Sequence, residues 1–199
     1  MFVKISEKIT NRLIRKNVIE DCNREIYLFG VDQFLMIALN IVTTIVIGLV
    51  LGELWQSILF VLMFMVLRSY AGGYHASTPV GCYFLTSSII AIALSVLKFI
   101  EINVLVCVGL LIISGVVILI LSPVQSENKP LDNIEFVIYR KKAITVWTVE
   151  FMCAVICTVV EFNDILMCIL LAHIALVLSQ LFAKVENGKI LKGMKNLEQ

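Results

Sequence analysis

The chain has 199 residues, of which 60% are hydrophobic and only 16% are charged, with a formal net charge of +1. Soluble domains have about 45–50% apolar and about 25% charged residues, so this composition excludes a water-soluble fold and indicates one polytopic membrane domain. The chain has no excess of basic residues, so its composition does not indicate a nucleic-acid partner. The six cysteines lie mostly in apolar segments without a paired spacing, so we expect no structural disulfides.

The first 33 residues are predicted to form a cytoplasmic, interfacial region. Phe2, Ile5, Ile9 and Leu13 recur at helical spacing, while the basic residues lie mostly on other faces. This pattern is typical of an amphipathic helix in the headgroup plane, and a solvated basic arm is the alternative. A second short helix is expected over 19–29. Charges throughout this region leave no apolar core for a signal peptide.

Six apolar segments follow, and the predicted fold is all-α, with six transmembrane helices behind the N-terminal amphipathic helix. The segments are 34–51, 54–67, 83–98, 103–122, 143–160 and 165–183. The membrane domain therefore covers 34–183, and 184–199 form a tail. A span needs about 20 apolar residues, so the second and third segments are short. The loop 68–82 between them is expected to dip into the membrane or to line a wet cavity.

The distribution of basic residues predicts the orientation. With six spans and a cytoplasmic N-terminus, every lysine and arginine except Lys98 lies on the cytoplasmic side. Five spans would place the four lysines of the tail outside. We therefore expect both termini, the loop 68–82 and the basic loop 123–142 to face the cytoplasm.

The loop 68–82 contains a histidine and a cysteine, which are the minimum apparatus of a thiol nucleophile and its base. His75 and Cys82 would lie about 10.5 Å apart on one continuous helix, too far for proton transfer. Gly72-Gly73 favours a break in the backbone, and Thr78-Pro79 has the pattern of an N-cap followed by proline at the first helical position. The loop would then allow His75 to fold back onto the sulfur.

A helix that starts at Pro79 would place Cys82 in its first turn. There the helix dipole and the free N–H groups stabilise a thiolate, and the same groups could stabilise an oxyanion. The alternative is a buried structural cysteine and a loop histidine bonded to a backbone carbonyl.

With these residues in place, the chain resembles the AgrB family of membrane peptidases. The resemblance is carried by Arg68, Gly73, His75 and Cys82, in the pattern Arg-x4-Gly-x-His-x6-Cys, and by length and hydropathy across nearly the whole chain. Gly30 before the first span and the Pro130 loop, which ends in Arg140-Lys141-Lys142, agree with it. The catalytic positions show no departure from the family pattern.

The resemblance implies a cysteine endopeptidase of the Gram-positive plasma membrane that removes the C-terminal tail of an AgrD-like quorum-sensing propeptide. Cys82 would attack a backbone carbonyl with His75 as general base, leaving an acyl-enzyme thioester. A cysteine or serine of the propeptide would then close a thiolactone or lactone ring. Thioester exchange is nearly balanced in energy, so no ATP and no cofactor are expected, but water must be kept from the intermediate.

The same resemblance implies a propeptide with an amphipathic leader and an acidic tail. The basic residues Arg140, Lys141 and Lys142 could attract that tail, although the positive-inside rule alone explains them. Arg68 could hold a propeptide carboxylate, the loop backbone or a lipid phosphate. We expect the bilayer as a partner and a homodimer as the oligomeric state.

Other polar residues inside the spans suggest weaker alternatives. Cys153, Cys157 and His173 make a metal site imaginable, but packed cysteines are far commoner and no His-Glu-x-x-His is present, so no metal is expected. Glu150 is expected to pair within the bundle or to lie near the cytoplasmic end of its span, and Asn40 to bond between helices.

The main rival function is a peptide exporter with loop 68–82 as a re-entrant gate. Transporters commonly have paired broken helices in two related halves, and here only one half is interrupted. A non-catalytic scaffold is the third possibility, but it gives no reason for a cysteine at a helix start near a histidine. The sequence names neither the ring chemistry of the propeptide nor a third catalytic residue.

Overall fold

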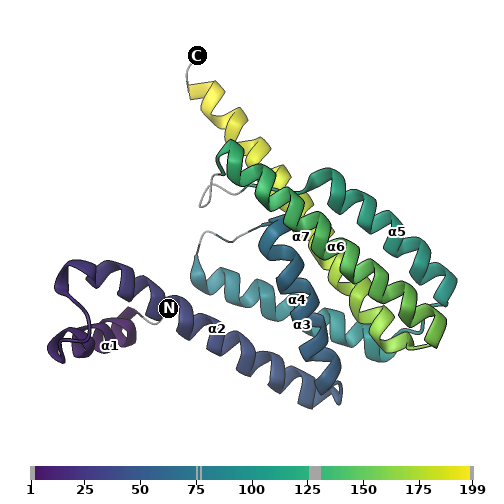
Figure 1. The fold of residues 1–199 in the computed structure, drawn as a ribbon, viewed down its shortest axis with the longest axis horizontal. Helices are drawn as coiled ribbons and strands as arrows, with labels where there is room; N and C mark the ends of the chain where they lie inside the picture. The colour runs from purple at the N-terminus through teal and green to yellow at the C-terminus, as the bar shows by residue number, and fades with distance from the viewer. Residues whose placement is uncertain (1–2, 75, 77, 126–130, 198–199) are drawn as a thin grey trace.

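The computed structural model describes residues 3–74, 76, 78–125 and 131–197. The helices are α1 (Val3–Arg15), a short 3-10 helix (Asp21–Asn23), α2 (Arg24–Leu51), α3 (Leu54–Ala71), α4 (Pro79–Phe99), α5 (Val104–Leu121), α6 (Asn133–Val160) and α7 (Asn163–Leu197), as Figure 1 shows. Each of the helices α2 to α7 is long and apolar enough to cross a bilayer. The prediction of an all-α protein with six membrane-spanning helices is therefore confirmed.

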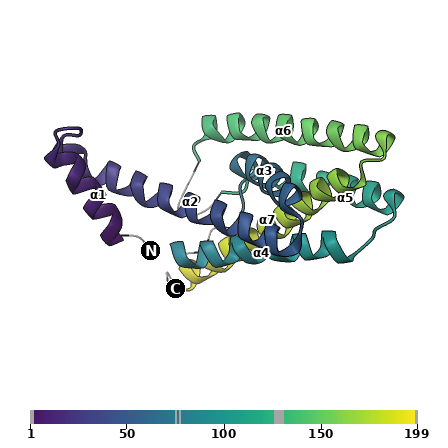
Figure 2. The same ribbon diagram turned by 90° about the horizontal axis from the view of Figure 1, so that it is seen from below.

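Helix α1 folds back beside the start of α2, and both project away from the bundle in Figures 1 and 2. Its small polar residues face α2, because Ser6 and Thr10 are fully buried and Ser6 Oγ lies 3.3 Å from Asp32 Oδ1. The apolar residues Ile5 and Ile9 stay exposed. The predicted amphipathic helix is thus present, with its apolar side free to enter a membrane interface.

Several predicted boundaries at the ends of the spans are wrong, because α3 continues to Ala71 and α7 to Leu197, beyond the predicted 67 and 183. No separate helix covers 19–29, because α2 starts at Arg24 and continues through Gly30, where a Cβ would meet nothing within 4 Å. Helix α6 begins at Asn133, ten residues before the predicted span. A capping box explains that start, since Asp132 accepts from the Glu135 N–H at 2.6 Å while the Glu135 side chain reaches back to the Asp132 N–H.

Helix α7 is the most buried of the six candidate spans and forms the centre of the bundle. Side chains from α3, α4 and α7 make most of its main core, to which α5 and α6 add one residue each, and Phe60, Leu67, Ile118 and Leu176 are all at most 1% exposed. Helices α5 and α6 approach closely where Gly115 faces the Trp147 ring, and a Cβ on this glycine would lie 2.6 Å from that ring. Small residues at such crossings are typical of membrane helices.

The α3–α4 and α5–α6 connections lie at the same end of the bundle (Figures 1 and 2). They are joined through the backbone, since Val124 N–H donates to the Ala71 carbonyl at 2.9 Å and Gly72 pairs with Val124 as an isolated bridge. Two loops that are distant in the sequence therefore form one surface, and the candidate site lies there.

Candidate active site

Helix α3 ends where the two glycines predicted a break. Gly72 has φ = +74° and Gly73 has φ = +154°, and the Gly72 N–H donates to the Arg68 carbonyl at 3.0 Å. A Cβ at Gly72 would lie 2.1 Å from the Val124 carbonyl oxygen. The chain needs glycine here both for its backbone angles and for the close approach of the neighbouring loop.

Helix α4 starts as the Thr78-Pro79 pair predicted. Thr78 is the N-cap, its Oγ1 accepts from the Gly81 N–H at 3.1 Å, and Pro79 occupies the first turn. Cys82 lies in that turn with a free, half-buried thiol. The helix start thus holds the sulfur at a rigid position that a substrate can approach, where the helix dipole favours negative charge.

The first turn offers fewer hydrogen-bond donors than we expected. Pro79 has no N–H, and the N–H groups of Gly81 and Cys82 both bind Thr78, the first through its side chain and the second through its carbonyl at 3.0 Å. A substrate oxyanion therefore cannot rely on these groups, and the expectation of an oxyanion hole made by several free N–H groups of this turn is not met.

Arg68, in the last turn of α3, is directed at the loop rather than at solvent. Its guanidinium donates to the Tyr74 carbonyl and lies over the Phe64 ring, 5.5 Å from the ring centre. Of the three roles considered for Arg68, this geometry favours holding the loop backbone.

His75 lies outside the described residues, and so does Pro130 of the predicted basic loop. Tyr74 and Thr78, described residues on either side of His75, both form hydrogen bonds that fix their positions. Tyr74, which precedes it, donates its N–H to both the carbonyl and the hydroxyl of Ser179, at 3.1 and 3.0 Å. Thr78, three residues later, caps α4. The short segment with His75 is thus anchored at both ends.

The remaining residues singled out in the sequence are Gly73, which lies against α7, and the three basic residues of α6. Gly73 is buried against α7, where its Cβ would lie 2.6 Å from Ser179 Oγ, which explains the need for glycine. Lys142 reaches α3 by lying over the Tyr70 ring, 5.3 Å from its centre. Arg140 and Lys141 are exposed on α6. Only Lys142 of the three basic residues therefore contacts the helix that carries Arg68.

Sequence reasoning missed three polar residues at this end of the bundle. Ser122, Ser179 and Gln180 are all at most 7% exposed, and Gln180 Nε2 donates to Ser122 Oγ at 2.9 Å and to the Ala71 carbonyl at 3.1 Å. The signal was two adjacent polar residues near the end of an otherwise apolar span, which the cost of burying unpaired polar groups makes informative.

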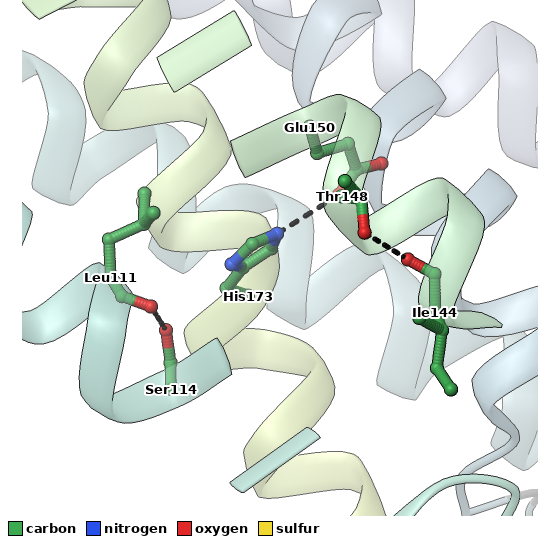
Figure 3. A network of polar contacts seen from close by, with 6 residues as sticks. All are labelled: Leu111, Ser114, Ile144, Thr148, Glu150 and His173. Carbon is green, nitrogen blue, oxygen red and sulfur yellow. Dashed lines mark hydrogen bonds and ion pairs between the residues drawn. The ribbon is translucent and has the colours of Figure 1, made fainter. Parts of the chain in front are cut away.

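The second histidine of the chain is in the middle of the bundle (Figure 3). His173 on α7 and Glu150 on α6 are 0% and 4% exposed, and their Nε2 and Oε2 atoms lie 3.0 Å apart. Of the two alternatives considered for Glu150, the structure shows the pairing inside the bundle. Asn40 was expected to bond between helices, but its Nδ2 donates to the Met36 carbonyl of its own helix, and its Oδ1 has no partner among the residues that the structure describes.

The imagined metal site finds no support in the geometry. Within the residues that the structure describes, no three side chains of His, Cys, Asp or Glu cluster as metal ligands. His173 instead bonds Glu150. Cys153 and Cys157 lie beside each other, and Cys157 is part of an apolar core cluster with Leu166 and Ile169.

A family model described as accessory gene regulator B matches residues 6–182, which is most of the chain. No curated protein and no solved structure gives a significant match to the chain. Members of this family are cysteine endopeptidases that process the AgrD autoinducing peptide precursor, which favours the peptidase over the exporter and the scaffold. The chain belongs to the AgrB family and is a multi-pass membrane peptidase of quorum sensing.

Proposed function

We propose that Cys82 is the nucleophile of this peptidase and His75 its general base, acting on the bond that joins the ring region of an AgrD propeptide to its C-terminal tail. The observation that carries this assignment is the position of the Cys82 thiol. It is half-buried in the first turn of α4, at the end of the bundle where the α3–α4 and α5–α6 connections meet. The other five cysteines are on different elements, and Cys107, Cys157 and Cys168 are buried in the bundle.

In the proposed reaction, His75 takes the thiol proton as the Cys82 sulfur bonds to the scissile carbonyl carbon. The tetrahedral intermediate collapses, the C–N bond breaks, and the proton passes from His75 to the leaving amine of the tail. The propeptide is then held on Cys82 as a thioester. A cysteine or serine of the ring region then attacks this thioester. His75 takes the proton of the attacking thiol or hydroxyl, the C–S bond to Cys82 breaks, and the proton passes to the Cys82 sulfur as the cyclic product leaves.

The surroundings of the site suit an intermediate that must avoid hydrolysis. Next to the loop, Ala71, Gly73 and Gln180 are buried, so bulk water does not reach these residues. Exclusion of water favours attack by the tethered side chain, which is already close to the thioester. Arg68 supports the loop, and Lys142 with Arg140 and Lys141 supplies positive charge for an acidic tail.

We also propose that this end of the bundle faces the cytoplasm. The support is the basic residues on the same end: Arg68 and Lys142 lie near the loop, whereas Glu101 and Glu161 follow the opposite ends of their helices. In intact cells, an impermeant maleimide should label Glu101→Cys and leave Gln125→Cys unlabelled until the membrane is opened. The reverse labelling would contradict this orientation. The homodimer stays a prediction.

The catalytic assignment is tested by co-expression with an AgrD propeptide and mass spectrometry of the products. We expect Cys82→Ala and His75→Ala to lose release of the tail, while Cys153→Ala, which replaces a half-buried cysteine of α6, processes normally. Processing that persists in Cys82→Ala would refute the assignment.

A further inference from the structure

We infer that Ser179 and Gln180 of α7 are positioning residues of the peptidase, which fix the backbone of Ala71 to Tyr74 that leads into His75. This inference rests on the proposed role of His75. Neither side chain belongs to the motif at the site, and both are more than 100 residues along the chain from the loop that they bind.

Ser179 holds the loop through the Tyr74 N–H. That single donor points at two acceptors on the same residue, the Ser179 carbonyl at 3.1 Å and the Ser179 hydroxyl at 3.0 Å. Arg68 donates to the carbonyl of Tyr74 from the other side. The backbone N–H and the backbone carbonyl of Tyr74 are therefore both bound. These two bonds restrict the rotation of the peptide units on either side of Tyr74.

Gln180 holds the end of α3. Its side chain is fully buried, and its amide nitrogen donates to the Ala71 carbonyl and to Ser122 Oγ. The Ala71 carbonyl is one of the last in α3 and lacks an intrahelical partner, so it needs such donors. Val124 N–H supplies the second one at 2.9 Å. The Gln180 amide of α7 thus joins this helix to the end of α3 and to Ser122, which directly follows α5.

These contacts have a purpose beyond packing because they converge on backbone atoms of one short segment. We call Arg68, Ser122, Ser179 and Gln180 the loop clamp. Polar groups inside a membrane bundle are costly unless they are bonded, and apolar residues would fill the same space at lower cost. The clamp instead fixes the path into His75, while the Thr78 cap fixes the path out of it.

A displacement of a catalytic group by about 1 Å can cost on the order of 100-fold in rate. We therefore expect Gln180→Leu, which removes both donors but keeps the volume, to lower kcat about 10–100-fold. Ser179→Ala keeps the carbonyl acceptor, so we expect a smaller loss of about 3–10-fold. Because the clamp does not contact the substrate in this account, KM should change by less than about 2-fold in both variants.

Matched controls exist within the bundle. Gln56→Leu replaces a glutamine that is 7% exposed at the far end of α3, and Ser114→Ala removes a 7% exposed hydroxyl that donates to the Leu111 carbonyl of its own turn. Both should keep the kcat of the parent. A loss of kcat in the controls equal to that in the clamp variants would mean general loosening of the bundle and would overturn the inference.

A second measurement does not depend on catalysis. Hydrogen–deuterium exchange of the full chain in lipid nanodiscs should be faster for peptides that cover 71–78 in Gln180→Leu, and unchanged in Gln56→Leu. If Gln180→Leu fails to accumulate, Ser122→Ala is measured instead, because it removes the bond between Ser122 and the Gln180 amide that helps to orient this amide toward Ala71. Unchanged exchange over 71–78 in every clamp variant would overturn the inference.

The inference and the proposed function fail in distinguishable ways. If Cys82→Ala is inactive while Gln180→Leu and Ser179→Ala keep the full kcat, the clamp has no positioning role and the catalytic assignment stands. If Cys82→Ala is active, the catalytic assignment fails, and the exchange measurement still decides whether the clamp holds the loop.

Discussion

Among the residues that the structure describes, the loop clamp and the Glu150–His173 pair are two polar clusters that are built in opposite ways. In the loop clamp, the side chains of Arg68, Ser179 and Gln180 bond backbone atoms of a loop at the end of the bundle. In the middle of the bundle, Glu150 and His173 bond each other, side chain to side chain, and both are at most 4% exposed (Figure 3). One cluster holds the loop that leads into the proposed catalytic residues, and the other is sealed between two helices.

This difference separates the tasks of the two histidines. A histidine sealed against a carboxylate between two helices joins those helices and has no path to a peptide. A histidine in a short segment whose two ends are held can meet a substrate and still return to one position. The comparison therefore predicts that changes at His75 affect the reaction and changes at His173 affect stability.

The largest expected effect is on the reaction. His75→Ala should lower the rate of tail release by about 10²–10⁴-fold, the usual contribution of a general base, while its unfolding midpoint in detergent stays near that of the parent. Release of the tail is measured by mass spectrometry. If His75→Ala keeps its rate, the assignment of the general base to the loop is wrong.

The opposite result is expected for the buried pair. His173→Leu leaves Glu150 buried without its partner, which should cost about 3–5 kcal/mol of stability. The double variant Glu150→Leu/His173→Leu removes both groups and should recover most of that loss. Unfolding in mixed micelles measures both. A single variant as stable as the parent would show that the pair does not hold α6 to α7.

A smaller effect is expected where the two loops meet. Gly72→Ala would bring a Cβ to 2.1 Å from the Val124 carbonyl oxygen at a φ of +74°, so we expect a loss of about 1–3 kcal/mol together with a lower kcat. Gly30→Ala is the matched control, because its Cβ would meet nothing within 4 Å and a helix favours alanine over glycine. Equal behaviour of the two variants would contradict a tight junction between the loops.

The smallest expected effect concerns the start of α4. Thr78→Ala removes the cap of the turn that carries Cys82 and should cost about 1 kcal/mol. Asn103→Ala removes the cap of α5, where the asparagine side chain accepts from the Leu105 N–H at 2.8 Å, at a comparable cost. Only Thr78→Ala should also lower kcat. A similar loss of kcat in Asn103→Ala would remove the special role of the α4 cap.

Local signals predicted much of this structure correctly. Apolar length identified six spans, and the residues of the loop itself predicted its breaks, because Gly72-Gly73 and Thr78-Pro79 act through their own backbone angles and caps. The same signals misplaced the start of α6, where a capping box extends the helix through charged residues that a hydropathy pattern excludes.

The loop clamp was beyond such reasoning. Ser179 and Gln180 stand out in the sequence as two adjacent polar residues near the end of an apolar span, but their partners Tyr74, Ala71 and Ser122 are far away in the sequence. Tertiary packing alone brings these residues together. The prediction of free N–H donors for an oxyanion was wrong for a related reason. Thr78, the cap that predicted the helix start, accepts hydrogen bonds from the N–H groups of Gly81 and Cys82.

The most direct test of the account is to trap the acyl-enzyme. The full chain is incubated with a propeptide whose ring nucleophile is replaced by alanine, and the intact mass and the site of modification are determined. We predict an adduct equal to the propeptide without its tail, attached to Cys82, and absent from Cys82→Ala and His75→Ala. Tail release without any adduct on Cys82, or an adduct on another residue, would contradict the central claim.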